Sequence, residues 1–172
     1  MIRASIGSLV FFLVAACDRA PTIPSAGVLT TADVAGGAVA TGPSASGAGT
    51  IEFGASKEHV SFNASGVLTP ATGSAEIHDN TVSGNVNAHV SINCLNVVGN
   101  QATISGIITQ TNDPTIQGFE ALWQVRDNGE GRKDAPDMMS PVLIFEVGVG
   151  PDCTVPSEFD LVNLKGNVRV VP

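Results

Sequence analysis

This 172-residue sequence contains three histidines, and their side chains could bind a transition metal if the fold brings them together. His59, His78 and His89 each fall on the polar side of a segment in which polar and apolar residues alternate. If the segment around Gly66–Thr72 forms a symmetric hairpin, His59 lies opposite His78, and with Glu76 nearby the group could hold zinc or copper. The alternative, which we expect, is that all three are exposed polar residues and that the protein has no metal site.

A second group of potential ligands is acidic and lies in a glycine-containing stretch. The group spans eleven residues and consists of Asp127, Asn128, Glu130, Asp134 and Asp137. Hard oxygen ligands of this kind can bind Ca²⁺. The spacing does not match an EF-hand loop, and Arg132 and Lys133 would repel a cation or pair with the acids. We therefore expect a solvated turn with local ion pairs, and calcium binding is the alternative.

Two cysteines, Cys94 and Cys153, lie in the second half of the chain. Outside the cytoplasm they can oxidise to a disulfide, which would close a loop of 59 residues and add about 4 kcal/mol in the chain-entropy model. Two free buried thiols are the alternative, and two cysteines alone do not complete a metal site. We expect the disulfide.

Enzyme motifs are missing from the sequence. Ser83, Ser105 and Ser140 lie in no nucleophile elbow, and Gly36-Gly37 opens no phosphate-binding helix. Aromatic residues make up only 5% of the chain, whereas a carbohydrate cleft with paired carboxylates needs many. Acids outnumber bases 16 to 8, which excludes nucleic acid as a partner because phosphate binding needs a positive surface. We expect a protein that is not an enzyme, with no catalytic residues and no cofactor.

The elements that would position these side chains are β-strands. Alternation with period two, as in His59-Val60-Ser61-Phe62, places one face of a strand on a core and the other in water. Turn-forming pairs such as Gly99-Asn100 separate the alternating runs. The strands are expected at 49–54, 58–64, 73–79, 84–98, 101–110, 118–127, 140–148 and 160–171.

The apolar positions of the 84–98 strand change parity at Cys94, from Val90 and Ile92 to Leu95 and Val97, which requires a β-bulge there. Short connections favour antiparallel neighbours and therefore an all-β fold, an up-and-down barrel or a sandwich. We favour a closed or nearly closed barrel, because closure removes exposed edges. The predicted core is Phe53, Phe62, Ile92, Ile104, Trp123, Val125 and Phe145.

The amino terminus has the pattern of an export signal. Arg3 is followed by an apolar run, Leu9–Cys17, that is too short to cross a membrane. Val14-Ala15-Ala16-Cys17 resembles the bacterial lipobox, which implies cleavage before Cys17 and attachment of lipid to its thiol. The expected domains are a signal peptide (1–16), a lipid-anchor cysteine with a flexible linker rich in small residues (17–48) and one β-domain (49–172). An additional strand at 28–39 is the alternative for the linker.

Four segments of the β-domain resemble the post-COAP-type domain of secreted and surface bacterial proteins. They are Val97–Gly106, Val125–Gly131, the later Asp137, and Leu164–Val170. The resemblance implies the fold of residues 49–172. It implies no enzymatic reaction, because no catalytic residues are established for that group.

These observations predict a non-enzymatic, lipid-anchored protein of the cell envelope. It would face the periplasm or the exterior and present its β-domain as an interaction or structural module. Its partners would be the membrane, through the anchor, and an unknown envelope protein or small ligand. Two alternatives remain. A carrier would keep an apolar cavity inside the barrel, and an envelope hydrolase would bring acidic and histidine side chains together in a concave site.

Overall fold

The computed structural model of the chain describes residues 42–81, 84–130, 134–155 and 158–172. Within these residues the chain forms strands and turns and no helix, so the predicted all-β class is confirmed. The strands are β1 (Ser44–Phe53), β2 (Ser56–Ser65), β3 (Thr72–Thr81), β4 (Gly84–Val98), β5 (Gln101–Thr111), β6 (Glu120–Arg126), β7 (Met138–Met139), β8 (Leu143–Phe145), β9 (Val162–Asn163) and β10 (Lys165–Val171).

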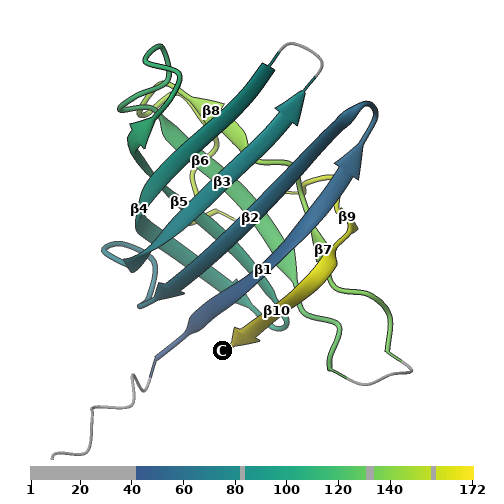
Figure 1. Ribbon diagram of the computed structural model, residues 1–172. Coiled ribbons are helices and arrows are strands. Elements are labelled where there is room, and N and C mark those ends of the chain that lie inside the picture. The colour runs from purple at the N-terminus through teal and green to yellow at the C-terminus, as the bar shows by residue number, and fades with distance from the viewer. Residues whose placement is uncertain (1–41, 82–83, 131–133, 156–157) are drawn as a thin grey trace, which may run out of the picture. The chain divides into compact units, whose positions relative to one another are not determined.

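All ten strands belong to one antiparallel sheet, which curls until it is nearly closed (Figure 1). Its order is β10-β1-β2-β3-β4-β5-β6-β7-β9, and β8 pairs with β6. β9 and β10 stand at the two ends of this order, yet only Leu164 separates them in the sequence. The two edges of the sheet therefore lie close together, and the preference for a nearly closed barrel is confirmed.

The predicted strand positions agree well with the structure in the first two thirds of the chain. The predicted strand at 84–98 has the bounds of β4, but β1 begins at Ser44, before the predicted position 49. Ala45 is fully buried, so the last residues assigned to the linker belong to the sheet. The carboxy-terminal strands are interrupted: Ser140–Val142 separates β7 from β8, and Leu164 separates β9 from β10.

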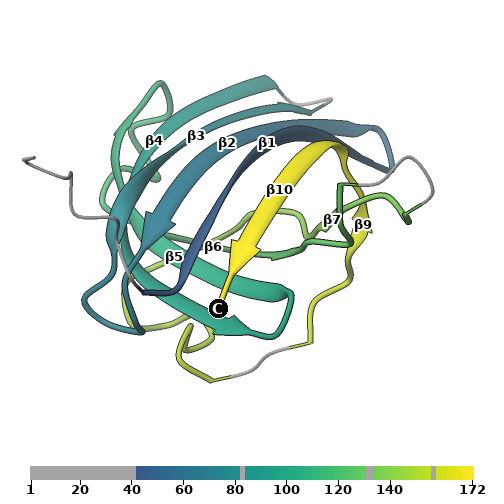
Figure 2. The ribbon, with the colours of Figure 1, turned by 90° about the horizontal axis from the view of Figure 1, so that it is seen from below.

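One cluster of buried apolar side chains lies in the barrel interior. Figure 2 shows β10 between β1 and β6 on the closing side of this barrel. The rings of Phe62 and Trp123 meet edge to face, with centroids 5.9 Å apart and planes at 73°. Seven alanines in the same cluster have small side chains and leave room for the rings of Phe62 and Trp123, which come from different strands, to touch. The predicted core residues Phe62, Ile92, Ile104, Trp123 and Val125 are all buried.

The bulge predicted at Cys94 is present, because the register of β4 against β5 shifts between Ile92 and Cys94. Gly106 lies opposite Ile92, and a Cβ on Gly106 would stand 2.4 Å from the Ser91 carbonyl oxygen. Glycine is therefore required where the two backbones approach at the bulge. The bulge turns Leu95 into the core and Cys94 to the outside of the barrel.

β5 and β6 are buried on both faces, which the alternating sequence pattern did not predict. Residues 146–155, here called the strap, lie over the outer face of these strands. Between the strap and the barrel wall, Cys153 of the strap forms a second cluster with Cys94 and Leu122, and Phe145 and Phe159 pack against it. Phe145 was predicted in the main core and belongs instead to this outer cluster. Gln124, whose side chain points away from the core that holds its neighbours Trp123 and Val125, is 3% exposed.

Candidate functional site

A row of polar side chains crosses the outer face of four neighbouring strands. Cross-strand pairing places Thr50 of β1, His59 of β2, His78 of β3 and Asn87 of β4 side by side. The side chains of these residues point outward because their sequence neighbours, such as Val60, point into the core. Both histidines are exposed. We call these four residues the histidine row.

Hydrogen bonds fix the ring orientation of both histidines in the row. His59 Nδ1 lies 3.1 Å from Thr50 Oγ1, and His78 Nδ1 lies 2.7 Å from Asn87 Oδ1. The two rings are stacked, with centroids 6.3 Å apart and planes inclined by 26°. The pairing of His59 with His78, predicted from a symmetric hairpin, is therefore confirmed.

Glu76 and His89 form a separate pair next to the row. They are cross-strand neighbours in β3 and β4, and His89 Nδ1 lies 3.6 Å from a Glu76 carboxylate oxygen. Among the described residues, no group of three or more histidine, cysteine or acidic side chains is placed to hold a metal ion. Glu76 therefore pairs with His89 and does not complete a site at His59 and His78.

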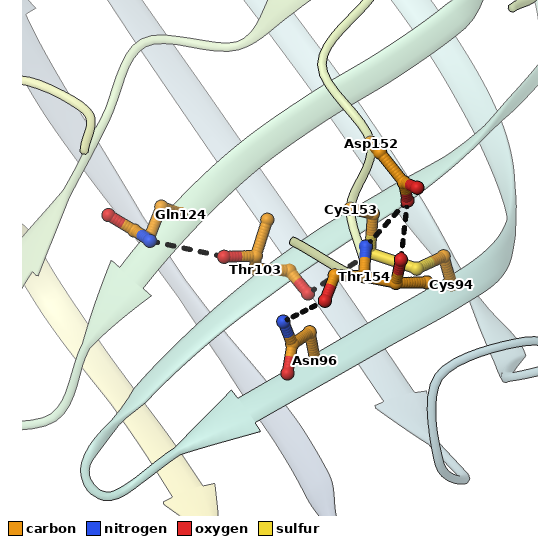
Figure 3. Close-up of a disulfide and its surroundings, with 7 residues drawn as sticks. All are labelled: Cys94, Asn96, Thr103, Gln124, Asp152, Cys153 and Thr154. Carbon is orange, nitrogen blue, oxygen red and sulfur yellow. Dashed lines mark hydrogen bonds between the residues drawn. A yellow bond between two sulfur atoms is a disulfide. The ribbon is translucent and has the colours of Figure 1, made fainter. Parts of the chain in front are cut away.

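The predicted Cys94–Cys153 disulfide is confirmed, and it fastens the strap to β4 (Figure 3). Asn96 donates a hydrogen bond of 3.1 Å to the Thr154 carbonyl beside it. The Asp152 carboxylate accepts hydrogen bonds from the hydroxyl and the backbone N–H of Thr154, which lower the pKa of Asp152. These contacts hold residues 152–154 against the outside of the barrel.

Three pockets lined by described residues open on the outer side of the barrel. One of about 440 Å³ lies between the strap and the wall, beside the disulfide and Ser105. A second, of about 480 Å³, is polar and lies between Arg126 and Phe159. The third, of about 330 Å³, is on the outer face of β2 and β3 next to Glu76.

Two carboxyl groups face the barrel interior at one end, where charged residues are not expected. Glu58 of β2 is directly opposite Asp79 of β3, and Glu58 is only 2% exposed. The Glu58 carboxyl accepts hydrogen bonds of 3.2 and 3.3 Å from the Val142 N–H, between β7 and β8. Burial raises the pKa of Glu58 to about 7, and the Asp79 charge adds to this rise. Burial also raises the pKa of Asp79.

A carboxyl group with a pKa near 7 can donate or accept a proton at neutral pH. Glu58 is too enclosed to reach a substrate, however, and both of its oxygens contact the Val142 N–H. The signal that could have identified it is its position in the sequence. Glu58 shares the parity of Val60 and Phe62, which places it on the inward face of β2.

The acidic stretch considered for calcium joins the two edges of the sheet. One Asp137 oxygen accepts a hydrogen bond of 2.8 Å from the Val168 N–H of β10, and the other accepts one of 2.8 Å from the Asn128 N–H. Asp127 accepts hydrogen bonds from the N–H groups of Val170 and Gly129. Asp137 is 5% exposed, so the expectation of a fully solvated turn is wrong for this residue. The carboxylates replace backbone carbonyls along the edge of β10 that faces away from β1.

No family model, curated protein or solved structure matches this chain. The resemblance to post-COAP-type domains stays a prediction. Cys17, the predicted signal peptide and the alternative strand at 28–39 lie outside the described residues. Among the described residues, no helix is long and apolar enough to span a membrane.

Asp137→Asn is expected to lower the free energy of unfolding by about 2 kcal/mol. The amide replaces one carboxylate oxygen with an N–H₂ group, so one of the two backbone donors, of Asn128 or Val168, loses its acceptor. Urea unfolding followed by Trp123 fluorescence measures the change. The control is Asp160→Asn, which alters an exposed carboxylate and should change stability by less than about 0.5 kcal/mol. Equal stability of the two variants would contradict the assigned role of Asp137.

Proposed function

We propose that the chain is an exported protein held on the cell membrane by lipid attached to Cys17. It presents the barrel outside the cytoplasm as an interaction or structural module and has no enzymatic activity. The observation that carries the proposal is the Cys94–Cys153 disulfide. Protein disulfides form and persist in oxidising compartments outside the cytoplasm. This agrees with the apolar leader and the lipobox-like Val14-Ala15-Ala16-Cys17.

The packing inside the barrel favours binding of a partner at the outer surface. A carrier would need space inside the barrel, whereas Phe62 and Trp123 meet there with their ring centroids 5.9 Å apart. Three pockets lined by described residues lie at the outer wall. The partner, an envelope protein or a small ligand, would therefore contact the outer wall, where the histidine row is exposed.

The charge of the chain supports an anchor made of lipid. Cleavage before Cys17 would remove Arg3 and leave seven basic against 16 acidic residues, a formal charge of −9. An anionic membrane surface repels a domain of this charge, so the domain would not adhere electrostatically. Several acyl chains, at about 0.8 kcal/mol per buried methylene, would supply the attachment.

Cys17→Ser is expected to abolish lipid attachment, because the hydroxyl does not replace the thiol in thioether formation. The variant should lose the mass of the lipid and should no longer be processed before residue 17. Mass spectrometry of the amino-terminal peptide from fractionated cells measures both effects. Ala16→Gly, which keeps a small residue before the cysteine, is the matched control and should be processed like the parent. A parent protein without lipid on Cys17 would overturn the proposed anchor.

A further inference from the structure

His59 and His78 have the exposure and the adjacent positions that a metal-binding pair requires. They are direct cross-strand neighbours on the outer face of β2 and β3, and both side chains are exposed. Their side chains therefore leave the same surface at adjacent positions, where Cβ atoms of such pairs stand about 4.5–5.5 Å apart. An ion from solvent can reach both rings.

The hydrogen bond to Asn87 fixes the tautomer of His78, and the contact with Thr50 is compatible with the same tautomer of His59. Asn87 Oδ1 is an acceptor, so His78 Nδ1, 2.7 Å away, carries the proton. The lone pair of the neutral ring is then on Nε2. Thr50 Oγ1 can accept from His59 Nδ1 in the same way at 3.1 Å. Metal-binding histidines commonly donate their other N–H to such a partner, which fixes the tautomer and the ring orientation.

The distance between the rings suits one shared ion. Imidazole nitrogens bind Zn²⁺ at about 2.0–2.1 Å, so two rings on one tetrahedral ion have centroids roughly 5–6 Å apart. The observed separation is 6.3 Å. Exposed side chains can close this difference by small rotations about their χ angles.

We propose that His59 and His78 bind one divalent transition-metal ion through their Nε2 atoms, with Thr50 and Asn87 orienting the rings. The protein supplies two ligands, and water completes the coordination. Imidazole ligands suit Cu²⁺, Ni²⁺ and Zn²⁺, and the general order of affinities places Cu²⁺ first. The acidic chain, with a formal charge of −8, attracts cations to its surface. This site goes beyond the proposed function and is independent of the lipid anchor.

The test is a calorimetric titration of the full chain with Cu²⁺ and with Zn²⁺. The double variant His59→Gln/His78→Gln is expected to bind at least about tenfold more weakly than the parent. The matched control is His89→Gln, which removes the third histidine of the same face and should change the affinity less than about threefold. Mg²⁺ should not bind at this pair, because it prefers oxygen ligands.

Asn87→Leu tests the role assigned to the hydrogen bond. The variant removes the acceptor for His78 Nδ1 but keeps both ligands, and it should weaken Cu²⁺ binding by about tenfold. Its thermal unfolding curve, measured without metal, separates this effect from damage to the fold. All variants retain Cys17, so binding that persists unchanged in the double variant belongs elsewhere and overturns the site. A parent that binds neither ion, or a loss in His89→Gln equal to that in the double variant, would overturn it as well.

Discussion

Replacing both Cys94 and Cys153 with alanine is expected to lower the free energy of unfolding by about 4 kcal/mol. The bond closes a chain separation of 59 residues, so its removal enlarges the conformational freedom of the unfolded chain. It also joins the strap to β4, over the buried Leu122. The loss is large against the total stability of a typical domain, about 5–15 kcal/mol. Guanidinium unfolding followed by far-UV circular dichroism measures it.

Reduction of the parent protein provides an independent measurement of the same effect. The parent unfolded in the presence of dithiothreitol should lose as much stability as the double alanine variant, without any change in sequence. Val149→Ala is the control within the strap, because Val149 is 70% exposed and should affect stability by less than about 0.5 kcal/mol. If reduction leaves the unfolding midpoint unchanged, the bond does not stabilise the barrel.

Local patterns were sufficient to predict the strands and the pairs that depend on their register. Alternation located β4 with its observed bounds, and the parity change at Cys94 located its bulge. The pairing of His59 with His78 followed from the symmetry of one short hairpin. Each of these features depends on residues that are close in sequence or on the simple rule of alternating faces.

Features that depend on contacts across the closed sheet could not be predicted in this way. Gln124 has the parity of a solvent-facing residue, but it is buried, and Phe159, far along the chain after β8, lies near it. Asp127 and Asp137 resemble a polar turn in sequence, and their carboxylates acquire a role only because β10 lies beside them. Alternation describes two faces of a strand and does not reveal a second layer or the partner at a sheet edge.

The charge of Glu58 predicts an exposed position, because charged residues are usually exposed. Its inward position requires the barrel to bury a carboxyl group, with Asp79 opposite and the Val142 N–H as the hydrogen-bond donor. Burial penalises the charged form more than this hydrogen bond favours it, so the pKa rises from 4.5 to about 7. The folded protein therefore holds the Glu58 proton more tightly than the unfolded chain does.

Glu58→Gln is expected to raise the free energy of unfolding by about 3 kcal/mol at pH 8 and to leave it nearly unchanged at pH 4. In the parent, the stability associated with protonated Glu58 is present below pH 4.5 and is lost as the pH rises to about 7. A pKa difference of this size corresponds to about 3 kcal/mol. Glutamine remains neutral, keeps the shape of the side chain and can still accept the Val142 N–H through Oε1.

Urea unfolding of parent and variant between pH 4 and pH 8 measures the difference, which should grow with pH and level off above about pH 7. Glu146→Gln is the matched control, because it removes a carboxylate from an exposed position and should shift stability by less than about 0.5 kcal/mol. Asp79→Asn should weaken the pH dependence only in part, because Asp79 is the smaller cause of the raised Glu58 pKa and burial is the larger. A Glu58→Gln protein less stable than the parent at pH 8 would show that the ionised carboxylate stabilises the barrel, contrary to the burial argument.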